Sequence, residues 1–529
     1  MKKIPNIIVI IGAYPDIGKG IFTGSICYLL QEAGLSVFPI KFDGYINYSS
    51  GTMNPYHGGA VFKYTEEEVF VLDDGYEGDA DSGYYERFTH KIFNNKSNIT
   101  NGRLFSMVGE MEKKNKLNYG EVLNYRFMRG VLSDWVLSEA KKSDIIVLEI
   151  GGTIGDKESE IMFDTLHLLQ SQQKVSLYTI MLSPYLIHTN SEGFEMSYRS
   201  KITRQGFEKS WRMGLMPSAL VLRVPKNVRI LPNDVGLIGL ETGLRNKEDV
   251  YTDPDCDCIY ELPQHIHNQD LDKNILNYFK LNGVHAEETR RLEKYAEQVK
   301  SIKISKKSIT LGIFGKAVSD DSYVSLKEAI EHASISQNVK MKIVWLDESQ
   351  NYKKELSRIN ALIVGEGLGY VPNKINALGY ARENSIPCLG LSFGCNLLVK
   401  EFCEKVSGKK VAIEELGEVG SVAINKKELR TGSINIILSS PVHYKKTALD
   451  ERIRHCSVYS ENLVNILKIS SLRITGIKKD TKEPVIFEDV KHPFYVGCMF
   501  HPEYTSHPGY PHPLFVKLIQ KGLKNKYAR

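Results

Sequence analysis

Short apolar runs separated by amphipathic stretches dominate the amino-terminal half of the chain. The run Ile7–Ile11 is β-branched or aliphatic throughout and ends at Gly12, after which a glycine-containing loop leads into an apolar-periodic helix through Leu30. Similar runs follow at Ser36–Ile40, Asp144–Ile150, Lys174–Leu182 and Ala219–Leu222. Continuous apolar runs are typical of strands that are buried on both faces of a parallel sheet. Their alternation with helical stretches predicts an α/β domain with a doubly wound parallel sheet.

The same pattern restarts in the carboxyl-terminal half. A helix is expected at Ser325–Ala333, and strands are expected at Ser308–Phe314, Met341–Leu346, Ala361–Val364 and Pro387–Leu391. The stretch between the two patterns, about Glu287–Lys307, is charge-rich and helix-forming, with a thin apolar stripe. A chain of 529 residues is too long for one core. We therefore predict an amino-terminal domain at 1–285, a linker at 286–307 and a second doubly wound α/β domain at 308–529.

Composition narrows the class of protein without naming a function. The net charge of +5 is mild for this length and does not favour a nucleic-acid partner. No apolar run reaches the ~18 residues that span a bilayer, and the run after Met1 is too short for a signal peptide. Cys256 and Cys258 form the one close cysteine pair, without a second Cys/His pair at zinc spacing, so we expect a partly buried loop there. The sequence predicts a reduced cytoplasmic enzyme with no membrane partner.

The loop after the first strand has the character of a phosphate site. Gly18, Lys19 and Gly20 stand between a strand and a helix, where backbone N–H groups and the helix N-terminus favour a phosphate over a plain turn. Gly20 occupies the place of the Ser/Thr that holds Mg²⁺ in a Walker-type loop. A metal ligand must then come from elsewhere, and carboxylates are the natural hard donors. Asp81 and Glu149 are the candidates, and Glu149 ends a buried strand, where such folds bind ligands. The alternative for Glu149 is an ion pair with a lysine at the core edge.

A second set of residues resembles the site of a class I glutamine amidotransferase. Gly390–Cys395 is similar to the nucleophile elbow G-x-C-x-G, and His501 and Glu503 match the family's H-P-E pair. Ser392, however, stands at the nucleophile position. A serine hydroxyl needs a base and an oxyanion hole tuned for it, whereas a thiolate forms readily beside a histidine. Cys395 lies three residues further on, inside the expected helix, and cannot substitute.

Four further segments, in order along the chain, resemble CTP synthase. They are Lys41–Asn47, Gly51–Pro55, Asp81–Phe88 and Glu149–Ser159. Together with the phosphate loop and the amidotransferase-like half, the resemblance covers nearly the whole chain. It implies a P-loop, dethiobiotin-synthetase-like amidoligase domain, in which ATP phosphorylates the 4-oxygen of UTP and ammonia from glutamine displaces that phosphate. It also implies Mg²⁺ and a homo-oligomer, either a dimer or a tetramer.

The resemblance implies a role for each matching position. Lys19 and Lys41 would be catalytic, because a transferring phosphoryl group needs cations around its spread charge. Asp81 and Glu149 would hold Mg²⁺. The remaining positions would bind the two nucleotides: Gly18, Lys19, Gly20 and Asp255 for ATP, and Asp156 and Glu158 for the ribose and base of a pyrimidine nucleotide. Asp16 replaces the family's serine, as an acid does in dethiobiotin synthetase.

The acceptor and glutaminase segments depart from the family. The triphosphate-binding run K-T-K-x-x-Q reads Arg199–Arg204, whose cations Arg199, Lys201 and Arg204 are expected to bind an anion. The family's later lysine has no counterpart. Arg126 and Arg129 add charge within Glu121–Arg129, although a solvated helix face is the alternative. The acceptor is therefore expected to be either UTP itself or another pyrimidine nucleotide.

On the glutaminase side, Glu366 enters the oxyanion segment, and Cys456 replaces the last arginine of E-R-H-R-H-R-Y-E. A carboxylate beside the intended oxyanion opposes its stabilisation. Ser392, His501 and Glu503 are thus expected to form a degenerate triad, with a rebuilt serine hydrolase as the alternative. We predict an ATP-dependent amidoligase that uses free ammonia or another amine. A pseudoenzyme that partners with a true CTP synthase is the competing hypothesis, and the joint presence of Lys19, Lys41, Asp81 and Glu149 disfavours it.

Overall fold

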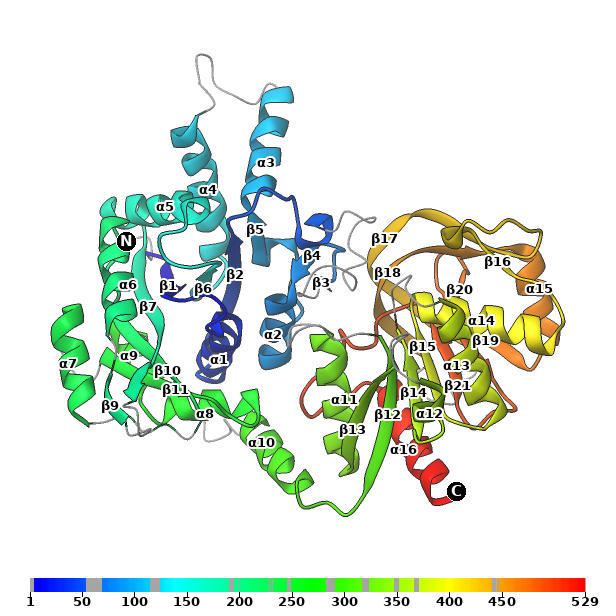
Figure 1. Ribbon diagram of the computed structural model, residues 1–529. Coiled ribbons are helices and arrows are strands. Elements are labelled where there is room, and N and C mark those ends of the chain that lie inside the picture. Colours follow the sequence, from blue (N-terminus) through cyan, green and yellow to red (C-terminus); the bar gives the residue numbers. More distant parts are fainter. Residues whose placement is uncertain are drawn as a thin grey trace. The chain divides into compact units, whose positions relative to one another are not determined.

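The computed structural model describes residues 4–53, 69–114, 124–189, 195–198, 200–226, 228, 230, 232–244, 249–281, 291–315, 323–346, 352–365, 371–439, 444 and 447–528. The chain forms two compact units (Figure 1). The first unit comprises Met1–Ser49 and Tyr84–Ala296, and the second comprises Ser50–Gly83 and Glu297–Arg529. A short segment from the amino-terminal half of the sequence therefore belongs to the second unit.

The first unit is built on a parallel sheet of seven strands within the described residues, in the order β11-β10-β7-β1-β6-β2-β5. The central strand β1 is buried at every position, as expected from its continuous apolar run. The strands are β1 (Asn6–Gly12), β2 (Val37–Asp43), β5 (Asn98–Thr100), β6 (Ile145–Ile150), β7 (Ser176–Pro184), β10 (Ala219–Val224) and β11 (Val250–Pro254). A small separate pair is formed by β8 (Ile187–Thr189) and β9 (Glu195–Tyr198).

Helices cover both faces of this sheet, because successive side chains of a buried strand point to opposite faces. Ile7, Val9 and Ile11 share one core with α4, α5 and α6, while α1 packs against β1, β2 and β6. The helices within this unit are α1 (Lys19–Glu32), α3 (Asn101–Lys113), α4 (Tyr125–Ala140), α5 (Glu160–Ser171), α6 (Lys201–Arg212), α7 (Pro232–Thr242), α8 (Leu262–His267) and α9 (Leu271–Tyr278). A boundary between the units falls within each of α2 (Ala80–Thr89) and α10 (Arg291–Ile302). Short 3₁₀ turns lie at η3 (Asn95–Ser97), η4 (Lys157–Ser159) and η6 (Ile259–Glu261).

The second unit contains a larger mixed sheet. Its parallel part runs β13-β12-β14-β15-β21, and β20, β19, β17 and β18 extend it with antiparallel pairs. The strands are β12 (Ser308–Phe314), β13 (Lys340–Leu346), β14 (Ala361–Val364), β15 (Cys388–Leu391), β16 (Ala412–Ile413), β17 (Ala423–Leu438), β18 (Ala448–Tyr459), β19 (Leu472–Lys478), β20 (Pro484–Asp489) and β21 (Tyr495–Cys498). The hairpin of β3 (Val69–Val71) and β4 (Glu77–Asp79) belongs to this unit as well, after the turn η1 (Ser50–Met53).

Helices again cover the two faces of the parallel part. α13 and α14 pack together on one side, and α11 packs against α16 and β13, while α16 packs against β12 and β14. The helices are α11 (Val324–Gln337), α12 (Tyr352–Leu356), α13 (Val371–Glu383), α14 (Phe393–Val406), α15 (Glu461–Ile469) and α16 (Pro513–Ala528), with the 3₁₀ turn η7 (Glu414–Leu416). The prediction of two α/β domains built on parallel sheets is confirmed, and the antiparallel extension is a feature that the strand pattern did not predict.

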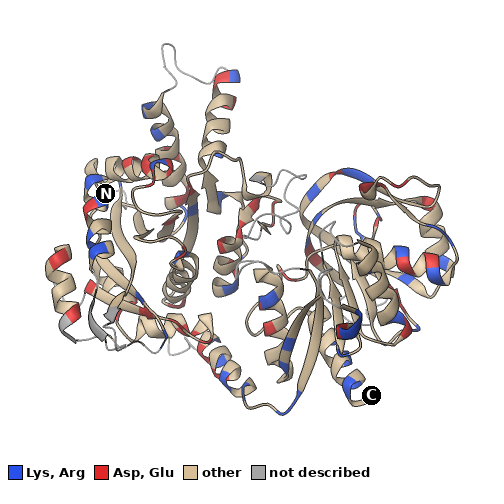
Figure 2. Ribbon diagram, in the orientation of Figure 1, with Lys and Arg blue, Asp and Glu red and all other residues tan. Residues whose placement is uncertain are grey.

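The charge-rich stretch that was expected as a linker contains α10. Lysine, arginine and acidic residues alternate along this helix, and both signs are interspersed over the ribbon elsewhere (Figure 2). Within the residues that the structure describes, no helix is long and apolar enough to cross a membrane. The boundaries 1–285, 286–307 and 308–529 stay predictions.

Candidate active site

Glu149 lies at the carboxyl end of β6, with Ile10 and Lys41 as its register partners on the two neighbouring strands. Its side chain is fully buried. Lys41 Nζ lies 3.1 Å from Glu149 Oε1, and the hydroxyls of Thr23 and Tyr85 donate to Glu149 Oε2 at 2.9 and 2.6 Å. A buried carboxylate is stable only when it is paired and hydrogen-bonded in this way. Thr23 and Tyr85 are site residues that sequence reasoning missed, since their approach depends on how α1 and α2 pack.

The phosphate loop adopts the geometry that its glycines predict. Gly18 has a φ of 83°, a left-handed conformation that favours glycine, and it caps α1. Lys19 Nζ donates to Gly152 O at 2.9 Å. A Cβ on Gly12 would lie 3.2–3.3 Å from the Lys19 side chain, so the lysine folds back over the start of the loop. Both Lys19 and Lys41 are buried, at 8% and 5% exposure.

This donor set fits a polyphosphate and a hard cation. A helix N-terminus with a glycine-rich loop offers N–H groups to phosphate oxygens, and carboxylate oxygens are the ligands that Mg²⁺ prefers. Glu149 supplies such oxygens, of which Oε1 now pairs with Lys41 and Oε2 accepts from Thr23 and Tyr85. Asp81 lies in the first turn of α2, where its backbone N donates to Asp79 Oδ1 at 3.2 Å. Its pairing with Glu149 around a metal stays a prediction.

The predicted acceptor residues divide between two elements. Asp156 and Glu158 are exposed on the loop after β6, where Asp156 Oδ2 accepts from Thr153 N at 2.6 Å. Lys201 and Arg204 are exposed in the first turn of α6. Arg199 and Glu366 lie outside the described residues. Arg126 and Arg129 begin α4, and their part in any site stays a prediction.

One cation that sequence reasoning missed lies next to the Asp156 loop. A Cβ on Gly155 would come within 2.8 Å of the Lys209 side chain, so Lys209 of α6 covers this glycine. A hydrogen bond of 2.6 Å between the hydroxyls of Ser183 and Thr203 joins α6 to β7. A Cβ on Gly206 would come within 2.9 Å of Ala13 in the phosphate loop. The same face of α6 thus joins the phosphate loop to the Asp156 loop.

Asp255, the expected adenosine contact, follows β11 directly. Arg223 bridges two acids, with Nη1 2.5 Å from Asp253 Oδ1 and Nη2 2.7 Å from Asp255 Oδ1. Burial raises the pKa of the Asp253 carboxyl to about 6, against the lowering effect of Arg223. Asp255 is half-exposed and therefore accessible to a ligand.

The second unit keeps the geometry of a nucleophile elbow around Ser392. Ser392 joins β15 to α14 with φ 50° and ψ −113°, a strained conformation for a non-glycine residue. A Cβ on Gly390 would lie 2.8 Å from Gly394 O, and a Cβ on Gly394 would collide with the carbonyl oxygen of Val364. Both glycines are therefore required by close packing of the turn.

His501 and Glu503 also keep the arrangement of a base and its orienting acid. Glu503 Oε1 lies 2.8 Å from His501 Nδ1, and the His501 ring stacks on Tyr504. Ser392 Oγ donates to Arg454 O at 3.4 Å. Cys395 is fully buried in α14, and burial raises the pKa of its thiol to about 12. Such a thiol is inert as a nucleophile at neutral pH.

Two residues of the segment that resembles the glutamine-anchoring run contact carboxylates of this chain. Arg454 Nε lies 2.7 Å from Glu77 Oε1 of the β3–β4 hairpin, and the Arg454 residue is buried. Cys456, which stands where the family has its last arginine, donates from Sγ to Glu415 Oε1 at 2.7 Å. The space beside these residues therefore holds carboxylates of the chain itself.

Comparisons with known proteins identify the family of the chain. A family model described as CTP synthase N-terminus matches residues 6–281, and one described as glutamine amidotransferase class-I matches residues 318–521. A CTP synthase of Acidobacterium capsulatum is 31% identical over 97% of this chain and 95% of its own length. A CTP synthase of Buchnera aphidicola subsp. Schizaphis graminum is 31% identical over 97% of this chain and 96% of its own length.

Among solved structures, the glutaminase domain of Trypanosoma brucei CTPS with bound acivicin aligns with a TM-score of 0.38 and 24% identity, over 41% of this chain and 94% of that one. The family matches together span both units, and the full-length relatives align almost from end to end. The chain therefore belongs to the CTP synthase family, as a ligase of that type with a class I glutamine amidotransferase domain.

Proposed function

We propose that this protein is an ATP-dependent amidoligase that phosphorylates a carbonyl of UTP or a related pyrimidine nucleotide and aminates it with free ammonia or another amine. The observation that carries the proposal is the buried group of Lys41, Glu149, Thr23 and Tyr85 beside an ordered phosphate loop. The Glu149–Lys41 ion pair alone also fits the structural alternative for Glu149, and the ordered phosphate loop with the buried Lys19 supports the catalytic one. In the amidotransferase-like unit, Glu77 and Glu415 contact Arg454 and Cys456 of the glutamine-anchoring segment. These contacts support a nitrogen donor other than glutamine.

In this function the chain's residues act mainly by position and charge. The acceptor's carbonyl oxygen would bond to the terminal phosphorus of ATP as the bond to ADP breaks, and Lys19 and Lys41 would stabilise the negative charge on the phosphoryl oxygens. The amine nitrogen would then bond to the activated carbon, losing a proton as phosphate leaves. Glu149 and Asp81 would hold Mg²⁺, which neutralises phosphate charge when bound.

The direct test is release of ADP from Mg–ATP with ammonium and a panel of pyrimidine nucleotides, alongside glutamine as the competing nitrogen source. We expect ADP and an aminated nucleotide in equal amounts with ammonium. An absence of ATP turnover with every acceptor and amine would contradict the proposal. In that case, activation of a true CTP synthase by the added protein would favour the regulatory partner instead.

We expect glutamate release from glutamine to stay at background, with or without ATP and acceptor. Ser392 carries a hydroxyl, which is a weaker nucleophile at neutral pH than the thiolate of the family's cysteine. In addition, Glu415 accepts a hydrogen bond from Cys456, which stands where the family has its last arginine. Ser392→Cys alone should not restore the activity, because the glutamine-binding groups are also changed. The measurement is glutamate formation, with Ser392→Ala as the matched blank. Robust release by the parent chain that disappears in Ser392→Ala would refute this expectation.

We expect Arg204→Gln to raise the acceptor concentration for half-maximal ADP release by about tenfold or more, because a charged hydrogen bond to a phosphate is lost. Arg212→Gln, an exposed change at the other end of α6, is the matched control and should leave that concentration unchanged. The acceptors to compare are UTP, UMP, UDP, deoxyuridine nucleotides and uridine conjugates. We expect UTP to be used less well than another of these. Equal behaviour of the two variants would remove Arg204 from the acceptor site, and UTP outperforming every other acceptor would leave an ammonia-dependent CTP synthase.

A further inference from the structure

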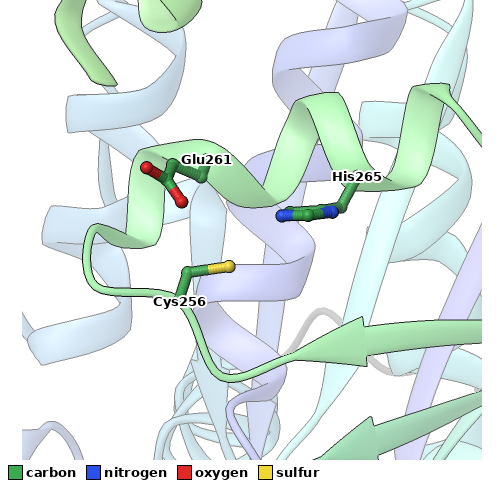
Figure 3. Close-up of side chains that lie close together, drawn as sticks. All are labelled: Cys256, Glu261 and His265. Carbon is green, nitrogen blue, oxygen red and sulfur yellow. The ribbon is translucent and has the colours of Figure 1, made fainter. Parts of the chain in front are cut away.

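Three potential metal ligands meet on the loop and helix that follow β11. Cys256 lies on the loop after β11, Glu261 ends η6 and His265 lies in α8. The thiol, a carboxylate oxygen and an imidazole nitrogen all lie within 4.8 Å of one another. Figure 3 shows the three side chains facing one another across the gap between the loop and the helix. The sequence predicts only a partly buried loop here, because Cys256 and Cys258 have no second Cys/His pair at zinc spacing.

The backbone on both sides of this cluster is held in place. Gln269 joins β11 to α8, since its Oε1 accepts from Thr252 N at 2.7 Å and its Nε2 donates to His265 O at 2.9 Å. Cys258, Tyr260 and Leu262 are buried between the ligand positions. Glu261 and His265 are four residues apart, so successive helical turns place them on one face. The cluster is therefore carried by a fixed scaffold.

The charge around the cluster favours a cation. Glu261, Asp253 and Asp255 lie near enough to act electrostatically on the Cys256 thiol, and Arg223 is the opposing cation. Metal binding replaces the thiol proton, so a divalent ion would offset the acidic surroundings.

We propose that Cys256, Glu261 and His265 form a site for one zinc ion, with a fourth position open to water or another ligand. A mixed set of sulfur, nitrogen and oxygen donors suits zinc, whereas Mg²⁺ and Ca²⁺ prefer oxygen alone. Zinc bonds of about 2.0–2.3 Å place tetrahedral ligand atoms about 3.3–3.8 Å apart, so side-chain rotations of roughly 1 Å complete the site. Cys256 directly follows Asp255, and a bound ion would fix that loop. This positioning effect on Asp255 rests on the proposed function, but zinc binding does not.

The test uses the untagged full-length protein, treated with a chelator and dialysed, to which Zn²⁺ or Co²⁺ is added. We expect one bound ion per chain by elemental analysis, and a thiolate-to-cobalt charge-transfer band with the strong visible absorption of tetrahedral Co²⁺. Cys256→Ser and His265→Gln should each weaken zinc binding by about 100-fold or more, since each removes a direct ligand. The matched control is Cys456→Ser, which changes another half-buried cysteine and should bind like the parent.

Two results would contradict the proposed zinc site. One is a parent chain that binds no more zinc than Cys256→Ser, and the other is unchanged binding in His265→Gln. His265 is exposed, so that variant is expected to fold, and circular dichroism checks this. Because the readout is metal content and cobalt absorption, failure of the zinc site leaves the ligase proposal untouched, and failure of ligase activity leaves the zinc site untouched.

Discussion

Lys19→Ala is expected to lower ATP turnover by about 10²- to 10³-fold, the usual effect of removing one preorganised charge from a group that develops negative charge. The lysine is buried, folds back over Gly12 and donates to Gly152 O, so its ammonium group is held at the phosphate loop before any ligand arrives. The measurement is ADP release with saturating acceptor and ammonium, together with the affinity for ATP from calorimetry.

Lys142→Ala supplies the matched control for that change. Lys142 is an exposed lysine that pairs with Glu139 at the end of α4, and its loss should change stability by no more than about 0.5 kcal/mol. Both variants should have the circular dichroism spectrum of the parent. Turnover by Lys19→Ala at the rate of Lys142→Ala would show that phosphoryl transfer takes place elsewhere.

Glu149→Ala is expected to abolish turnover and to lower the free energy of unfolding by about 3 kcal/mol, because the buried Lys41 loses its carboxylate at 3.1 Å and keeps only Asp43, at 4.0 Å. The two effects have different causes. The stability loss comes from a buried lysine charge that is less well compensated, whereas the loss of turnover would come from removing a ligand for Mg²⁺. Denaturant unfolding measures the first, and ADP release over a range of Mg²⁺ concentrations measures the second.

The double variant Lys41→Met/Glu149→Gln separates these causes. Both charges are removed, and the glutamine oxygen can still accept from Thr23 and Tyr85, so most of the stability should return. Turnover should stay absent. If Glu149→Ala, once shown to be folded, turns over ATP with the Mg²⁺ dependence of the parent, Glu149 has no part in metal binding.

Much of the fold could be predicted because buried parallel strands leave a clear trace in sequence. The expected runs at Ser308–Phe314 and Ala361–Val364 coincide with β12 and β14, and the others shift by a few residues at their ends. The long antiparallel pair β17–β18 left no such trace. Lys426, Lys427 and Glu428 stand exposed in the middle of β17, so its sequence lacks the alternation that marks a half-buried strand.

The candidate site was predictable where a short local pattern marks it, as in the phosphate loop and at the end of a buried strand. Glu149 could be placed because ligands bind at the carboxyl ends of parallel strands, whereas Lys41 was expected only from the resemblance to CTP synthase. Tyr85 and Lys209 could not, because each depends on how a helix packs against a distant part of the chain, and the Cys256 cluster could not, because it depends on how the loop after β11 folds against α8. Sequence motifs for zinc sites require paired Cys and His residues at fixed spacing. Cys256, Glu261 and His265 come from a loop, a 3₁₀ turn and a helix and do not match such a motif.

The membership of the β3–β4 hairpin in the second unit has a consequence for synthesis on the ribosome. Val69 O accepts a hydrogen bond from Tyr504 Oη, 435 positions later, and Arg452 reaches Val71 O. At ~5–20 residues per second, the hairpin waits on the order of 20–90 s before its partner surface is translated. Its apolar residues Val69–Val71, buried in the finished fold, stay exposed during that time. A chain that terminates before Tyr504 would keep them exposed and be prone to aggregate through these strand edges.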